Sequence, residues 1–127
     1  MKTLLTATAI AITAACAPAQ AVAYEDATSV RQYCENVSHY VERRAERIAD
    51  ARQRGYNGME AARMYAFSNT LGDTPSYNGW SPRREMADFL QTVTIKIYMQ
   101  PERTNWFSFV RRIGDVTFEG CMKGVGR

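Results

Sequence analysis

The sequence has few of the residues that build metal or redox centres. It contains a single histidine, His39, and three cysteines, and it has no Cys-x-x-Cys motif. A structural zinc site needs four Cys or His ligands, and a thioredoxin-like centre needs two cysteines in that motif. We therefore expect no metal, no cofactor and no redox centre.

The chain also has no strong excess of either charge. Sixteen Lys and Arg residues stand against thirteen Asp and Glu residues, which gives a formal net charge of +3. A nucleic-acid-binding domain normally carries a strong positive field, and a nearly balanced chain does not produce one. We therefore expect no nucleic-acid partner.

Long hydrophobic runs are missing except near the N-terminus. Lys2 precedes an uncharged apolar run from Leu4 to Cys16, and Ala-Val-Ala at residues 21–23 suits a signal peptidase. The run is too short for a membrane-spanning helix, which needs about 20 residues. We predict that residues 1–23 are a cleaved signal peptide and that residues 24–127 form one periplasmic or secreted domain.

Cys16 leaves one alternative open. It follows two alanines, a small pair that suits lipoprotein processing, in which Cys16 would become an acylated N-terminus. The third residue before it, Thr13, is polar where such signals carry a larger aliphatic side chain. We favour simple export, so membrane association is not expected unless Cys16 is lipidated.

Two cysteines, Cys34 and Cys121, remain after removal of residues 1–23. An exported chain with two cysteines most simply pairs them, and no other intramolecular pairing exists. Closing so long a loop stabilises a protein by about 4–5 kcal/mol in the chain-entropy model. We predict a structural disulfide between these residues.

Apolar residues at spacings of three and four predict two helices in the first half of this domain. The first covers residues 29–53, because Ser29 opens a capping-box sequence and Gly55 suits a C-terminal turn at positive φ. Its apolar face comprises Val30, Tyr33, Cys34, Val37, Tyr40, Val41, Ala45 and Ile48. The second helix starts after a capping residue, Asn57, and runs to about Thr70.

Residues 72–82 are rich in Gly, Pro, Asn and Ser and form the one clear loop. Ser81 followed by Pro82 is typical of a helix start, so a third helix is predicted from 82 to about 99. Its apolar positions are Met86, Phe89, Leu90, Val93 and Ile97. The β-branched run at 92–99 favours a strand instead, but a single strand would have no partner.

Pro101 ends the third helix, and a fourth follows it. The apolar positions in this segment are Trp106, Phe109, Val110, Ile113, Val116 or Thr117, and Cys121. An antiparallel arrangement of the first and fourth helices brings Cys34 and Cys121 together on their apolar faces. We therefore predict an all-α fold, a four-helix-bundle-like single domain closed by one disulfide.

The segments "YCENVSHYVERRAERIADARQRGYNGMEAARMY" and "IYMQPERTNWFSFVRRIGDVTFEGCMKG" resemble small exported bacterial proteins with one early and one late cysteine. The residues that carry the resemblance are Cys34, Gly55, Glu60, Tyr98, Pro101 and Cys121. The resemblance implies an envelope location and a helical fold, and it carries no assigned activity. In architecture the chain is also similar to periplasmic acid-stress chaperones and secretion-system immunity proteins, which bind other proteins.

Tyr77 and Trp80, in the Gly- and Pro-rich loop, are the candidate partner-binding residues. Tyr and Trp dominate binding hot spots, and loops often carry function. The alternative is that Trp80 packs under the third helix near Met86 and only anchors the loop. We predict a monomeric protein-binding module of inhibitor, immunity or envelope-chaperone type, with another envelope protein as its partner.

Four arginines form a possible basic patch if the first and fourth helices are neighbours. They are Arg43, Arg44, Arg111 and Arg112. Such a patch would suit a passive envelope component that binds anionic surfaces. The alternative is a set of surface ion pairs, each contributing less than about 1 kcal/mol.

We expect no catalytic activity. His39 has a serine beside it, but neighbouring positions on a helix do not face each other. Glu42, Glu46 and Asp50 share one helix face, whereas glycoside hydrolysis needs two carboxylates in different environments of a cleft. The alternative, a small cell-wall or lipid hydrolase, requires a pocket that joins His39 or these acids to another helix.

Overall fold

A computed structural model describes residues 24–125, so the predicted signal peptide lies outside the described residues. Within this range the chain forms four α-helices and one short 3-10 helix, and its only β-contacts are isolated bridges. The elements are α2 (Val30–Gln53), α3 (Gly58–Tyr65), η1 (Ser68–Thr70), α4 (Arg83–Met99) and α5 (Trp106–Val125). The predicted all-α class is confirmed for this part of the chain.

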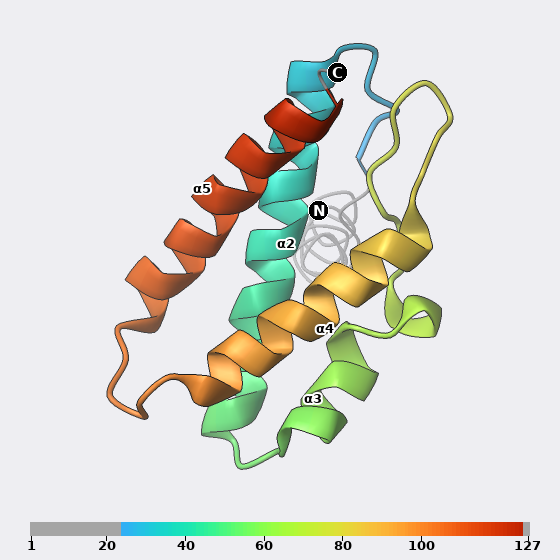
Figure 1. The fold of residues 1–127 in the computed structure, drawn as a ribbon. Coiled ribbons are helices and arrows are strands. Elements are labelled where there is room, and N and C mark those ends of the chain that lie inside the picture. The colour runs from blue at the N-terminus through green and yellow to red at the C-terminus, as the bar shows by residue number, and fades with distance from the viewer. Residues whose placement is uncertain (1–23, 126–127) are drawn as a thin grey trace, which may run out of the picture.

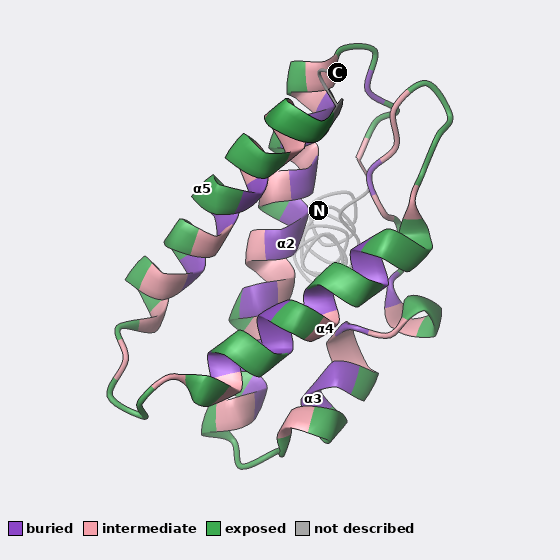
Figure 2. Cartoon of the chain, in the orientation of Figure 1, coloured by how far each residue is buried: buried purple, intermediate pink, exposed green. Residues whose placement is uncertain are grey.

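The other helices are arranged around α2, which packs against α5 on one side and against α3 and α4 on another (Figure 1). α5 runs antiparallel to α2, because its first residue, Trp106, contacts Arg52 near the end of α2 while Cys121 meets Cys34 near the start. Figure 2 shows the exposed residues of α5 on its outer side and the more buried ones toward α2. α2 is therefore the centre of the fold.

The predicted disulfide is present and joins the two ends of the domain. Cys34 and Cys121 are bonded, with their Cα atoms 5.6 Å apart, and they are 87 positions apart in the sequence. Cys34 is fully buried, whereas Cys121 is half-buried on α5. The bond thus ties the last turns of α5 to the buried face of α2.

The predicted apolar face of α2 forms the core, together with residues from the other helices. Buried positions on α2 recur at the helical spacing. Leu90 and Ile97 of α4 and Val110 of α5 belong to the same core cluster. The α2 residues in this cluster are Tyr33, Cys34, Val37, Tyr40, Val41, Ala45, Ile48, Ala49 and Ala51. The periodicity that predicts the helix therefore also predicts which side is buried.

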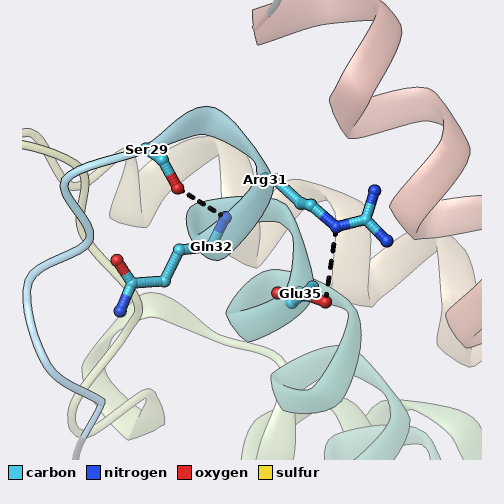
Figure 3. A network of polar contacts seen from close by, with 4 residues as sticks. All are labelled: Ser29, Arg31, Gln32 and Glu35. Atoms are coloured by element: carbon cyan, nitrogen blue, oxygen red, sulfur yellow. Dashed lines mark hydrogen bonds and ion pairs between the residues drawn. The ribbon is translucent and has the colours of Figure 1, made fainter.

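Short-range polar contacts define the start of α2. The Ser29 hydroxyl accepts a hydrogen bond of 3.1 Å from the backbone N–H of Gln32 (Figure 3). The Gln32 side chain accepts from the N–H of Thr28, one residue before the cap. Arg31 and Glu35 form an exposed ion pair at 3.8 Å one turn further on (Figure 3), which contributes little to stability.

The second helix is shorter than predicted. The capping box of Asn57 and Glu60 is present, but α3 ends at Tyr65 instead of near Thr70. Both the hydroxyl and the backbone N–H of Thr70 donate to the carbonyl of Phe67, at 2.7 and 2.9 Å. Such local side-chain bonds compete with α-helical hydrogen bonding. The chain therefore forms the 3-10 helix η1 at Ser68–Thr70 instead of continuing α3.

Residues 92–99, whose β-branched side chains favour a strand, are helical, because α4 includes the whole run. Val93 and Ile97 enter the core, and the buried hydroxyl of Thr94 donates to the Leu90 carbonyl at 2.8 Å. Burial of this apolar face outweighs β-propensity, which spans only about 1 kcal/mol per residue. The prediction of a helix from 82 to about 99 is therefore confirmed apart from its first residue, since α4 covers Arg83–Met99.

The start of α4 differs from its prediction. Ser81 does not cap the helix, because its hydroxyl lies 2.8 Å from the hydroxyl of Thr74 across the loop. Pro82 occupies the N-cap position instead, without a side-chain cap. The prediction was wrong because the partner of Ser81 comes from the preceding loop, not from the helix.

A close approach sets the spacing of α2 and α5. Gly114 is buried, and a Cβ atom at this position would overlap the Glu42 side chain. The Ser38 hydroxyl also donates to the Gly114 carbonyl at 2.7 Å. Glycine at position 114 therefore lets the two helices come together where Ser38 and Glu42 lie.

At the other end of these helices, Arg52 joins three elements. Its guanidinium group lies over the rings of Tyr98 and Trp106, 5.6 and 5.5 Å from their centroids. It also donates to the Ile97 carbonyl at 2.6 Å. Arg52 thus holds the end of α4 and the start of α5 against α2.

Candidate binding surface

The loop that carries Tyr77 and Trp80 is built around a two-residue turn. The N–H of Tyr77 donates to the Trp80 carbonyl at 2.8 Å, and the N–H of Trp80 donates back at 2.9 Å. Asn78 and Gly79, between them, have φ angles of 48° and 81°. Two successive positive φ angles are typical of a type I′ turn, which favours Asn-Gly. That dipeptide is the sequence signal that could have identified the turn.

The residues before α2 hold this turn in place. The N–H of Ala27 donates to the Ser76 carbonyl at 2.9 Å, and the N–H of Asn78 donates to the Ala27 carbonyl at 3.0 Å. The Asp26 carboxylate accepts from the Ser76 hydroxyl at 2.7 Å and from the Gly79 N–H at 2.9 Å. The turn is thus anchored by residues about 50 positions away in the sequence.

These contacts predict that the turn is sensitive to acid. The hydrogen bonds from the Gly79 N–H and then the Ser76 hydroxyl lower the pKa of Asp26 below its ordinary 3.8. A carboxyl group with a lowered pKa stabilises the fold above its ordinary pKa, and this contribution is lost as pH falls through the folded value. We expect the near-ultraviolet circular dichroism of the loop aromatics to weaken as pH falls below 3.8.

The matched variants are Asp26→Ala and Glu25→Ala, which alter neighbouring exposed carboxylates. Asp26→Ala should show the weakened aromatic signal already at neutral pH, with helical content unchanged. Glu25→Ala should behave like the wild type at every pH. An aromatic signal in Asp26→Ala equal to that of the wild type at neutral pH contradicts the anchoring role of Asp26.

Tyr77 and Trp80 both lie against Tyr33 of α2. Their ring centroids are 5.9 and 5.8 Å from that of Tyr33, which is itself buried. Trp80 nevertheless keeps 53 % of its surface exposed. The turn therefore presents a tryptophan supported on one side by Tyr33 and open to solvent on the other.

An apolar groove of about 380 Å³ lies between α4 and α5, and its lining includes Val37, one helical turn after Tyr33. Pro82, two residues after Trp80, lines it, and Figure 1 shows α4 and α5 diverging from the segment that joins them. The apolar side chains along it are Val37, Pro82, Met86, Phe89, Val116 and Cys121. We call this feature the α4–α5 groove.

Two apolar residues of the groove were predicted to belong to helical core faces. Phe89 is 39 % exposed and Val116 is 61 % exposed, whereas their neighbours Leu90 and Thr117 are buried. A helix turns by about 100° per residue, so moving one position takes a side chain from the core to the rim. The open choice between Val116 and Thr117 is thereby decided in favour of Thr117 as the buried residue.

Two arginines of the predicted basic patch have aromatic contacts within their own helices. Arg44 lies over the ring of Tyr40 at 5.4 Å, and Arg111 lies over the ring of Phe107 at 5.9 Å. Such contacts at exposed sites contribute about 0.5–1 kcal/mol. Convergence of Arg43, Arg44, Arg111 and Arg112 on one surface stays a prediction.

The three carboxylates considered as catalytic groups line a second hollow. Glu42, Glu46 and Asp50 border about 330 Å³ between α2 and α5, beside Trp106 and Phe107. Their shared helix face was predicted, but the hollow was not, because its other wall comes from α5. Glu46 and Asp50 are exposed, Glu42 is half-buried, and the hollow joins these carboxylates to α5, so the hydrolase alternative stays a prediction.

His39 is exposed, and its Nδ1 lies 3.0 Å from the hydroxyl of Tyr24. It shares a shallow hollow with Ser38 and several acidic side chains. The hydroxyl of Ser38 is engaged with the Gly114 carbonyl, so Ser38 and His39 do not form a nucleophile and base pair in this arrangement. Among residues 24–125, no group of three or more His, Cys, Asp and Glu side chains is placed to hold a metal ion.

The helices between residues 24 and 125 include none that is long and apolar enough to cross a membrane. No protein-family model, curated protein or solved structure matches the chain. The fold and its surface define a small, disulfide-linked helical protein with an exposed tryptophan beside an apolar groove.

Proposed function

We propose that this chain is a small exported protein-binding module, of the inhibitor, immunity or envelope-chaperone type, and not an enzyme. The observation that supports the proposal is the half-exposed Trp80, held on Tyr33 next to the α4–α5 groove. Tryptophan and tyrosine are enriched in binding hot spots, which are surrounded by apolar surface that excludes water.

The location and architecture belong to the same proposal. Disulfides form and persist in oxidising compartments, so the bond between Cys34 and Cys121 supports export to the periplasm or beyond. Export includes removal of residues 1–23. We further propose that the helices act as one four-helix-bundle-like, monomeric domain.

The turn that carries Trp80 and the α4–α5 groove are suited to binding because both are held in place. The Asp26 contacts fix the turn that carries Trp80, and the disulfide fixes Cys121 in the wall of the groove. A surface that is already ordered loses less conformational entropy when a partner binds. Tight binding is therefore compatible with so small a domain.

The proposal is tested with residues 24–127 as bait in an extract of the bacterial envelope. Trp80→Ala is expected to lower recovery of the partner about 30-fold, because hot-spot truncations cost about 2 kcal/mol or more. Phe107→Ala is the matched control, since Phe107 is an exposed aromatic that lines the other hollow. Circular dichroism is used to check that both variants keep their helices.

Tyr77→Ala provides a second variant of the same loop. It removes a ring that lies against Tyr33, so we expect a smaller loss than for Trp80→Ala. Equal recovery by the wild type, Trp80→Ala and Tyr77→Ala would show that this loop does not contribute to partner binding. A loss with Phe107→Ala equal to that with Trp80→Ala would place the binding surface elsewhere.

A further inference from the structure

The α4–α5 groove has the form of a helix-binding groove. Its two walls are helices, and its floor includes Val37 of α2. Side chains at the surface of two neighbouring helices leave a channel into which the side chains of another helix pack. The backbone N–H groups of these walls are hydrogen-bonded within the helices, so recognition of a bound segment must come from side chains and not from strand pairing.

One charged side chain, Glu85, lines this otherwise apolar groove. Glu85 also acts on Tyr33, the residue that supports Trp80. Burial raises the pKa of the Tyr33 hydroxyl, and the negative charge of Glu85 raises it further. The ion pairs found between residues 24 and 125 are Arg31–Glu35 and Arg54–Asp50, and neither includes Glu85. A partner that covers the groove therefore covers a carboxylate as well as apolar surface.

Covering a carboxylate without a partner is unfavourable, because the charge loses its hydration. A Lys or Arg side chain in the bound segment compensates for this loss, and an acidic one adds repulsion. Charge complementarity of this kind selects partners more than it adds to affinity. The apolar walls and the single carboxylate thus specify the chemistry of the occupant.

We infer that the α4–α5 groove binds an amphipathic helix of the partner protein, which places apolar side chains against Phe89 and Val116 and a Lys or Arg side chain at Glu85. The inference rests on the proposed function and deepens it by naming the chemistry of the partner segment. It separates Trp80, which anchors any partner, from Glu85, which selects among partners.

The test uses a phage-displayed library of helical peptides, selected on residues 24–127 of the wild type and of Glu85→Lys. The wild type is expected to enrich peptides with apolar residues at helical spacing and a Lys or Arg at one flanking position. Glu85→Lys is expected to enrich Asp or Glu at that position. Asp88→Lys is the matched control, because it makes the same charge change at an exposed α4 position outside the groove lining.

Affinities of the enriched peptides give the quantitative readout. A peptide selected on the wild type should bind Glu85→Lys about tenfold or more weakly, since an interfacial charge pair is replaced by repulsion. Changing its basic residue to Glu should restore most of that binding to Glu85→Lys. Phe89→Ala should weaken both peptides. Glu85→Gln, which conserves shape, should remove the charge preference without reversing it, and this keeps the test valid if the lysine variant folds poorly.

Several results would overturn the inference. They are a failure to enrich peptides, enriched peptides without a basic residue, and binding that Glu85→Lys leaves unchanged. A dimer whose interface is the groove, or an acyl chain that binds there in place of any peptide, would also overturn it. Partner capture that requires Trp80 but is indifferent to Glu85→Lys overturns this inference and leaves the proposed function standing. Indifference to both variants overturns both.

Discussion

Replacing both Cys34 and Cys121 with alanine is expected to lower the free energy of unfolding by about 4–5 kcal/mol. The bond spans 87 positions, so its loss greatly increases the conformational freedom of the unfolded chain. α5 packs chiefly against α2, and the disulfide lies near the end of that contact. A loss of this size is a large fraction of the stability of a small domain, which is about 5–15 kcal/mol.

The measurement is urea denaturation of residues 24–127, a form that lacks Cys16. The double alanine variant should unfold at a much lower urea concentration and with a steeper dependence on urea, because its unfolded state exposes more surface. Wild-type protein kept reduced by a dithiol serves as the control and should unfold like the variant. A loss below about 1 kcal/mol would mean that helix packing alone holds α5 in place.

Leu90→Ala is expected to destabilise the protein by about 2–5 kcal/mol, whereas Phe89→Ala costs about 1 kcal/mol. Leu90 is fully buried in the core, and truncating it removes apolar contacts and leaves a cavity. Phe89 is partly open to solvent in the α4–α5 groove, so much of its ring contributes nothing to the core. Leu90 should therefore contribute mainly to stability, and Phe89 mainly to the surface of the groove.

Thermal and urea unfolding followed by circular dichroism measure the stability of both variants. Partner recovery from the envelope extract gives the second readout. Phe89→Ala should lose more partner binding than stability, since the ring lines the proposed docking surface. A stability loss for Phe89→Ala as large as that for Leu90→Ala would identify Phe89 as a core residue and would contradict an open groove.

The starts of α2 and α3 and the glycine turn after α2 were predicted well, whereas the 3-10 turn that follows α3 and the Asn-Gly turn, which are also local, were missed. Ser29 and Asn57 cap their helices, and Gly55 has a φ of 94°, because capping and glycine turns involve atoms within one helical turn. The disulfide was predictable because export would leave only Cys34 and Cys121. The core face of α2 followed from the helical period.

Features that depend on distant residues were predicted poorly or missed. Ser81 resembles a helix cap, but its hydroxyl is occupied by Thr74. Trp80 was identified as a candidate, yet nothing near it in the sequence indicates that Tyr33 supports it. The Asn-Gly signal for the turn was present, whereas its anchor, Asp26, lies in a segment without a recognisable motif.

The sequence by itself determined the helical class, the caps of α2 and α3, the buried face of α2 and the disulfide between Cys34 and Cys121. The helices, their caps and the buried face depend on residues within a few positions of one another. The disulfide follows because only one pairing of the two cysteines is possible. Tertiary structure alone decided that Phe89 and Val116 are exposed along a groove while Leu90 and Thr117 are buried. The physical reason is that the angle between α4 and α5 sets which side of each apolar face is covered, and that angle results from packing on α2.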